Sequence, residues 1–205
     1  EGTSALYQQR TAIVPAARGT AAMQRRAVEH GAVLRDRTPV LALEPTADGV
    51  DVVTASGRIS AARVVVSADA WTARLVEPLG ARLPLTVTEE QVTYFAPSDP
   101  EQFRPGRFPV WIWMDEPSYY GFPTYGEDTV KSAQDCGGPT VTGDERSGET
   151  DPAMLDRLAS FMASTFPASG PAVRSKRCLY TLTPDRDFVV SAVPGVPQVV
   201  VGLGA

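Results

Sequence analysis

Two cysteines, Cys136 and Cys178, and a single histidine, His30, are the residues best suited to nucleophilic or metal chemistry. One histidine with two cysteines argues against a Cys/His zinc site, so no metal is expected. Cys178 follows Lys176 and Arg177, and positive charge beside a thiol favours the thiolate, which is its reactive form. The residues alone leave two roles open for Cys178, a reactive thiol or an inert, small hydrophobic side chain.

Size and charge narrow the class of protein. At 205 residues and 43% hydrophobic content, the chain can form one sizeable core or two smaller ones. A net charge of −5 argues against nucleic-acid binding, which relies on clustered basic residues. The sequence contains no apolar run long enough to span a bilayer and no recognisable signal peptide. We therefore expect no nucleic-acid or membrane partner and a cytoplasmic location.

The first third of the chain has the pattern of one helix followed by short strands. Residues 19–31 carry apolar side chains at helical spacing and end in a glycine. The apolar residues 32–34 predict a short strand. Residues 39–43, 49–54 and 58–60 alternate and are separated by turn residues, which predicts a small antiparallel meander.

Two continuous apolar runs predict strands that are buried on both faces, as in a parallel sheet. The first spans residues 63–68 and opens into a short helical stretch at 72–79. The second kind of run returns near the end of the chain, at 188–190 and 198–201, and leads directly into the glycine-rich residues 202–205.

The region between these runs, residues 83–177, is rich in aromatics and alternating segments such as 86–95 and 110–114, which predicts antiparallel sheet. A helix is expected at 152–166, with Asp151 as its N-cap. Residues 135–150 are polar and glycine-rich and predict a loop.

The order of these elements is unusual for an autonomous protein. The first helix has no preceding strand, the last apolar run has no following helix, and no G-x-G-x-x-G motif is present to hold a pyrophosphate. We therefore expect further N- and C-terminal segments of the same protein to complete it.

Three stretches resemble the monomeric sarcosine oxidase and N-methyltryptophan oxidase family, within the D-amino-acid oxidase superfamily. The first is the apolar run and Ala-Trp pair of residues 64–71. The second is Tyr-Tyr-Gly-Phe-Pro at 119–123, followed by Lys131. The third is Cys-Leu-Tyr-Thr-Leu-Thr-Pro-Asp at 178–185, with Phe-Val-Val at 188–190. The three occur in the family's order and cover most of the chain.

The resemblance implies an α/β (α+β) fold, with part of a Rossmann-like FAD-binding domain and an antiparallel substrate domain. Residues 15–83 and 177–205 would belong to the FAD-binding domain, and residues 1–14 and 84–176 to the substrate domain. Relative to the family, the chain lacks the N-terminal dinucleotide fingerprint and a C-terminal continuation that carries a further active-site lysine.

The resemblance also implies a cofactor, FAD, and a reaction. A secondary amine or N-methyl amino acid would be oxidised by hydride transfer to the flavin, and dioxygen would be reduced to hydrogen peroxide. Cys178 would join the flavin covalently, Lys131 would place a positive charge beside it, and Tyr120 would line the substrate pocket. Further cofactor contacts are expected from Val40, Ala70, Trp71, Gly202 and Gly204.

One departure from the family concerns the substrate. Four residues after the lysine, the family has a histidine where this chain has Asp135, so a carboxylate substrate would meet a negative charge. A non-catalytic binding or interaction module, lacking the phosphate-binding loop, is the alternative function. An NAD-dependent dehydrogenase is disfavoured, because Cys178 and Lys131 have no role in one.

Overall fold

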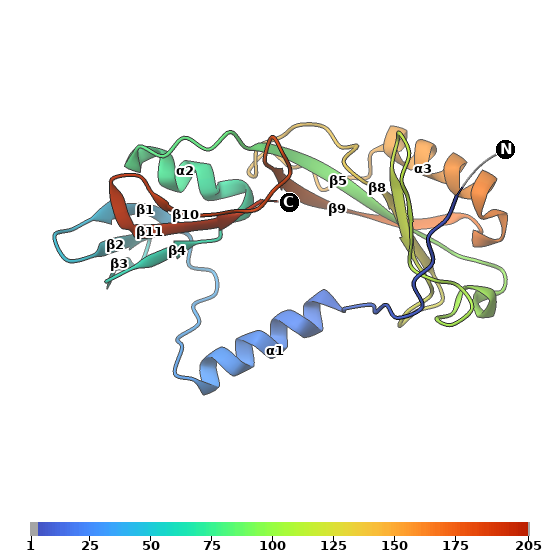
Figure 1. Ribbon diagram of the computed structural model, residues 1–205, viewed down its shortest axis with the longest axis horizontal. Helices are drawn as coiled ribbons and strands as arrows, with labels where there is room; N and C mark the ends of the chain where they lie inside the picture. Colours follow the sequence, from blue (N-terminus) through green and yellow to red (C-terminus); the bar gives the residue numbers. More distant parts are fainter. Residues whose placement is uncertain (1–3, 205) are drawn as a thin grey trace. The chain divides into compact units, whose positions relative to one another are not determined.

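The computed structural model describes residues 4–204, and its contacts divide the chain into two units, Glu1–Thr38 and Pro39–Ala205. The described part of the first unit, residues 4–38, contains one helix, α1 (Ala16–Glu29) (Figure 1). This confirms the predicted helix, which begins three residues earlier than expected, after Pro15. The strand predicted at 32–34 is wrong: these residues are exposed and have no strand partner among the described residues.

The second unit begins with the predicted meander. Strands β1 (Val40–Pro45), β2 (Val50–Thr54) and β3 (Gly57–Ala61) pair in order, and both pairs are antiparallel. The β2–β3 turn needs Gly57, whose φ of +127° lies in a region that other residues rarely adopt. Leu43 and Val50 contribute the buried side chains of this sheet.

A second sheet joins two distant parts of the chain. Strand β4 (Val64–Val66) pairs in parallel with β11 (Val196–Leu203), which forms an antiparallel hairpin with β10 (Val189–Val193) (Figure 1). The parallel pairing confirms the prediction. Burial on both faces was wrong, because Val66 lies in the core while Val65 is 71% exposed on the other face.

Three short helical segments follow β4. They are η1 (Asp69–Trp71), α2 (Thr72–Val76) and η2 (Glu77–Leu79), and they confirm the predicted helical stretch. Leu75 and Val76 of α2 are buried in the same core cluster as Val199 and Val201 of β11. The segment that follows β4 is therefore fixed against the second sheet.

The third sheet has five strands in the order β6-β7-β8-β5-β9, and all its neighbours are antiparallel. This confirms the predicted antiparallel region. The longest pair joins β5 and β9, which run side by side (Figure 1). The strands are β5 (Thr86–Phe95), β6 (Trp111–Trp113), β7 (Tyr119–Phe122), β8 (Val130–Gln134) and β9 (Ala172–Leu182), and the short helix η3 (Pro100–Phe103) follows β5.

Helix α3 (Pro152–Thr165) packs on one face of this sheet and is followed by η4 (Pro167–Ser169). The predicted N-cap is confirmed, since the Asp151 carboxylate accepts hydrogen bonds from the backbone N–H groups of Ala153 and Met154. Between β8 and α3, residues 135–150 form the predicted loop, which we call the excursion. No helix in the described part of the chain is long and apolar enough to cross a membrane.

Candidate functional site

The five-stranded sheet has two faces of different character. Side chains alternate along each strand, and residues directly opposite each other in an antiparallel pair lie on the same face. We call the face that packs on α3 the α3 face. We call the other the Cys178 face; its residues are Cys178 and Tyr180 of β9, Glu90 of β5, Lys131 of β8 and Tyr120 of β7.

Cys178 lies half-buried and directly opposite Glu90 in the β5–β9 pair. Burial raises the pKa of the Cys178 thiol, and the negative charge of Glu90 raises it further, while Lys131 and Arg177 act in the opposite direction. Arg177 therefore favours the thiolate, as predicted, but its charge does not outweigh burial and the charge of Glu90.

The reason is the alternation of the strand. Arg177 points to the α3 face, where its guanidinium lies 3.2 Å from the carboxylate of Glu89. Lys176 shares the Cys178 face, and its ammonium lies 5.9 Å from the centre of the Tyr94 ring. Arg177 thus pairs with Glu89, and Lys176 lies beside the Tyr94 ring, so neither forms an ion pair with the thiol.

Lys131 lies on the Cys178 face of β8, two strands across the sheet from Cys178 on β9. It is opposite Tyr94, four residues along β5 from Glu90, so about 16 Å separate the Cα atoms of Lys131 and Cys178. The Lys131 ammonium is 5.0 Å from the centre of the Phe122 ring, a cation–π distance. A flat group placed between Cys178 and Lys131 would have a thiol at one edge and a positive charge at the other.

Tyr120 and Tyr180 form the polar part of this face. Both are half-buried, and burial is the largest cause of the raised pKa of each phenol. A hydrogen-bonding interaction with Tyr180 lowers the pKa of Tyr120 in part, whereas the same interaction raises that of Tyr180. At neutral pH both hydroxyls therefore remain protonated and able to donate a hydrogen bond.

Sequence reasoning missed Glu90, although it is 2% exposed and lies under the site. It stands in a run of three buried polar residues, Glu89, Glu90 and Gln91, inside a strand that is otherwise apolar or hydroxylic. Consecutive charged residues within a predicted strand were the available signal, since a buried carboxylate requires hydrogen-bond partners.

The remaining predicted residues surround the second sheet. Gly202 and Gly204 lie at the carboxyl end of β11, next to the carboxyl end of its parallel partner β4. Ala70 and Trp71 form the η1 turn, which contacts β9. Val40 begins β1 and packs against the core of the second sheet.

Trp71 is held by the excursion. Its indole N–H donates to the Asp144 carboxylate at 2.8 Å, and the same carboxylate accepts from Arg74 at 2.9 Å. Gly143 lies so close to the Trp71 ring that an added Cβ would come within 2.7 Å of it. The orientation of Trp71 is thus set by a segment more than seventy residues away in the chain.

These residues fit part of a flavin dinucleotide. Half-buried aromatics, a thiol and an ammonium suit the flat, partly apolar ring, and the edge formed by the ends of parallel strands is where such cofactors bind in α/β sheets. The pyrophosphate has no counterpart, since no glycine-rich turn in the described residues leads from a strand into a helix. The described residues therefore suit the ring and offer no cradle for the phosphates.

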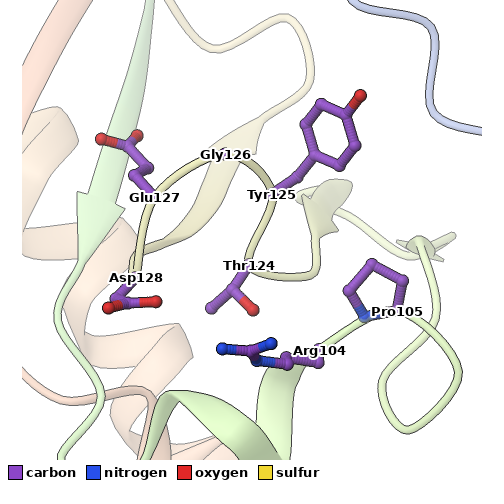
Figure 2. A pocket seen from close by; sticks show the side chains of 7 residues that line it. All are labelled: Arg104, Pro105, Thr124, Tyr125, Gly126, Glu127 and Asp128. Atoms are coloured by element: carbon purple, nitrogen blue, oxygen red, sulfur yellow. The ribbon is translucent and has the colours of Figure 1, made fainter.

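A cavity of about 430 Å³ lies elsewhere, around the turn that follows β7 (Figure 2). It is open and polar, with Arg104 and Asp128 among its side chains. None of the predicted site residues lines it, so it does not contribute to the candidate site. Its lining consists of Arg104, Pro105, Thr124, Tyr125, Gly126, Glu127 and Asp128.

Several known proteins are similar to this chain in structure or in sequence. The structure of NikD, described as an unusual amino acid oxidase essential for nikkomycin biosynthesis, superposes with a TM-score of 0.78 at 30% identity, covering 91% of this chain and 51% of that one. Monomeric sarcosine oxidase from Bacillus sp. (strain NS-129) is 30% identical over 85% of this chain and 46% of its own length. N-methyl-L-tryptophan oxidase from Yersinia pestis (strain Pestoides F) is 31% identical over 86% and 47%, respectively.

The fold is therefore that of FAD-dependent oxidases. The family model "FAD dependent oxidoreductase" matches residues 2–205, and the chain belongs to this family. The chain spans about half the length of the curated relatives it matches.

Proposed function

We propose that this chain is the substrate-binding part, together with a portion of the cofactor-binding part, of an amine oxidase. Its substrate would be a secondary amine or an N-methyl amino acid. When bound, FAD would accept a hydride equivalent from the amine carbon and transfer the electrons to dioxygen, giving hydrogen peroxide. The observation that carries the proposal is the shared face of Cys178, Lys131 and Tyr120 on one sheet.

Each of these residues would have a distinct task. The Cys178 sulfur would bind the flavin ring covalently and so fix its position. The Lys131 ammonium, held over Phe122, would present a fixed positive charge where negative charge develops on dioxygen. The protonated hydroxyl of Tyr120 would donate a hydrogen bond that orients the substrate. Val40, Ala70, Trp71, Gly202 and Gly204 would complete the cofactor contacts.

The domain assignment is part of the proposal. Residues 15–83 and 177–205 would contribute to the FAD-binding domain, and residues 1–14 and 84–176 to the substrate domain; residues 1–3 and 205 lie outside the described part. Two separate core clusters support the division, one around β4 and β11 and the other around β7 and α3. Two free cysteines are compatible with the cytoplasmic location that we propose.

Mass spectrometry of the full-length protein would test the covalent link. We expect a flavin adduct in the wild type that is lost in Cys178→Ser and retained in Cys136→Ser, the control at the other free cysteine, in the turn that follows β8. An adduct that persists in Cys178→Ser would remove Cys178 from the mechanism. A protein with neither flavin nor peroxide formation would favour the non-catalytic module instead.

The role of Lys131 can be tested by measuring the rate at which dioxygen reoxidises the flavin and peroxide is produced. Replacing it with methionine keeps the apolar length of the side chain and removes the charge, and we expect the rate of flavin reoxidation by dioxygen to fall about a hundredfold. Lys176→Met is the control, because it removes an exposed positive charge from the same face. Equal rates in the two variants would contradict the proposal.

A further inference from the structure

Glu90 is the most deeply buried charged side chain on the Cys178 face. One oxygen of its carboxylate accepts a hydrogen bond from the Thr88 hydroxyl at 2.7 Å. The other accepts from the backbone N–H groups of Gly137 and Gly138, both at 3.0 Å. Three donors converge on this group, and the ionised carboxylate, which is acceptor-only, satisfies all of them.

The two glycines belong to the first turn of the excursion, directly after Asp135. In this turn Cys136 has a φ of +54°, a conformation that non-glycine residues adopt only when their surroundings hold them in it. The turn also lies against β5 itself, since a Cβ on Gly138 would come within 2.2 Å of the Glu89 carbonyl oxygen. Glu90 supplies the hydrogen bonds that hold this strained turn in contact with the strand.

The turn begins at the edge of the candidate site. The Asp135 backbone N–H donates to the Ser118 carbonyl at 2.9 Å, which continues the β7–β8 pairing by one residue. The Asp135 carboxylate is close enough to Tyr120 and Tyr180 to raise the pKa of both. A shift of the turn would therefore move a negative charge relative to the two phenols.

We propose that Glu90 is a positioning residue of the Cys178 face, holding the 135–138 turn and with it the Asp135 carboxylate beside Tyr120 and Tyr180. Glu90 and Asp135 place two negative charges at one end of this face, offset in part by Arg186, which lies 3.9 Å from the Asp135 carboxylate, while Lys131 places a positive charge at the other end. The substrate end of the face is thereby the negative one, which suits the cationic form of an amine. This last step rests on the proposed function, whereas the contacts of Glu90 do not.

The same carboxylate acts on Cys178, which lies directly opposite it. After burial, the charge of Glu90 is the largest contribution to the raised pKa of the thiol. The other charged or titratable groups that influence this thiol or its phenol neighbours are Lys131, Arg177, Glu89, Tyr120, Tyr180 and Asp135. A change in the charge at position 90 should therefore change the pKa of the Cys178 thiol.

Amide hydrogen exchange would test the positioning role. In Glu90→Ala we expect the Gly137 and Gly138 amides to exchange at least about tenfold faster, because both lose a charged acceptor. The matched control is Gln91→Ala. Gln91 is the next residue of β5 and equally buried, but it bonds the Asp151 backbone from the α3 face. This control should speed exchange at Asp151 and leave Gly137 and Gly138 unchanged.

The Glu90→Gln variant removes the negative charge of the side chain and keeps its shape. Its amide oxygen can accept from both glycine N–H groups, and its NH₂ group can donate to the Thr88 hydroxyl. We expect exchange at Gly137 and Gly138 to stay close to that of the wild type. In protein prepared without flavin, in which the Cys178 thiol is free, the pH profile of Cys178 alkylation should shift to lower pH, with alkylation about threefold faster at neutral pH.

Both measurements are independent of flavin and of catalysis, so their outcome does not depend on the proposed function. Unchanged exchange at Gly137 and Gly138 in Glu90→Ala would overturn the positioning role. An alkylation profile of Glu90→Gln that matches both the wild type and Gln91→Ala would overturn the electrostatic part. If Glu90→Ala does not fold, faster exchange at Gly137 and Gly138 in Thr88→Val would support the role, and wild-type exchange there would contradict it.

Discussion

The two faces of the five-stranded sheet use neighbouring residues of the same strands for opposite purposes. On the α3 face, Glu89 and Arg177 form an ion pair whose side chains are 4% and 5% exposed. On the Cys178 face, the adjacent residues Glu90 and Cys178 lie opposite each other, and the thiol remains half-exposed.

The α3 face is closed by packing and pairing. Phe161 of α3 stacks on Tyr119 with ring centres 4.1 Å apart, and Trp111 packs beside both Phe161 and Phe166. The Cys178 face instead keeps hydroxyls, a thiol and an ammonium within reach of solvent. The comparison indicates that stability resides on the α3 face, whereas the chemistry that we propose involves the Cys178 face, so substitutions on the two faces should have different consequences.

The largest expected effect is on the α3 face. Arg177→Ala leaves the Glu89 carboxylate buried without its charge partner, which should lower the free energy of unfolding by about 3–5 kcal/mol. Urea denaturation would measure it. If the free energy of unfolding falls no further than it does for a surface substitution, the two faces do not differ in stability as proposed.

The second largest effect should be a loss of folding stability at low pH, caused by Glu89 on the same face. Burial raises the pKa of Glu89, but hydrogen bonds from Gly148 and Ser147 and the pairing with Arg177 outweigh it and bring the pKa to about 2, from an ordinary 4.5. A group whose pKa is lowered on folding stabilises the protein above its unfolded pKa. The contribution, about 3 kcal/mol, should therefore disappear as the pH falls from about 4.5 to about 2.

Unfolding measured across this pH range in the wild type and in Glu89→Gln would test the assignment. The variant should be less stable at neutral pH and should show a flatter acid limb. The same acid dependence in both proteins would assign the effect to other carboxyl groups.

A smaller effect is expected at the start of α3. Asp151→Ala removes the cap that accepts from Ala153 and Met154, which should cost about 1 kcal/mol. Asp156→Ala, in an exposed position of the same helix, is the control for loss of charge. Thermal unfolding of the two variants would separate capping from charge, and equal shifts would exclude capping.

The smallest effect on stability is expected at the candidate site itself. Cys178→Ser keeps the size of a half-exposed side chain and should change the free energy of unfolding by about 0.5 kcal/mol or less. The same denaturation measurement applies. A loss comparable to that of Arg177→Ala would show that Cys178 serves the core, and would weaken its assignment to the cofactor.

The sequence predicts elements well where local chemistry decides them. The cap at Asp151, the meander and the bounds of β5 all follow from periodicity and turn residues. The predicted strand at 32–34 is wrong because a strand needs a partner, and pairing is a property of the whole chain. Val65 is exposed for a similar reason, since an apolar run does not reveal which of its faces is covered.

The site was predictable only in part. Cys178, Lys131 and Tyr120 were proposed from the resemblance, and their common face follows from register, which no single strand reveals. Arg177 favours the Cys178 thiolate as predicted, but its pairing with Glu89 on the opposite face could not be read from sequence neighbours. Glu90 was missed because its partners are backbone N–H groups, and these have no signature in the sequence.

The excursion between β8 and α3 has a practical consequence for anyone handling the protein. Although it contains no helix or strand, its backbone is tied to β5 at Gly137, Gly138, Ser147 and Gly148. A protease must draw several residues of slack chain into its cleft before it can cut. A segment whose composition resembles a cleavable linker is thus expected to resist limited digestion for as long as its buried anchors hold.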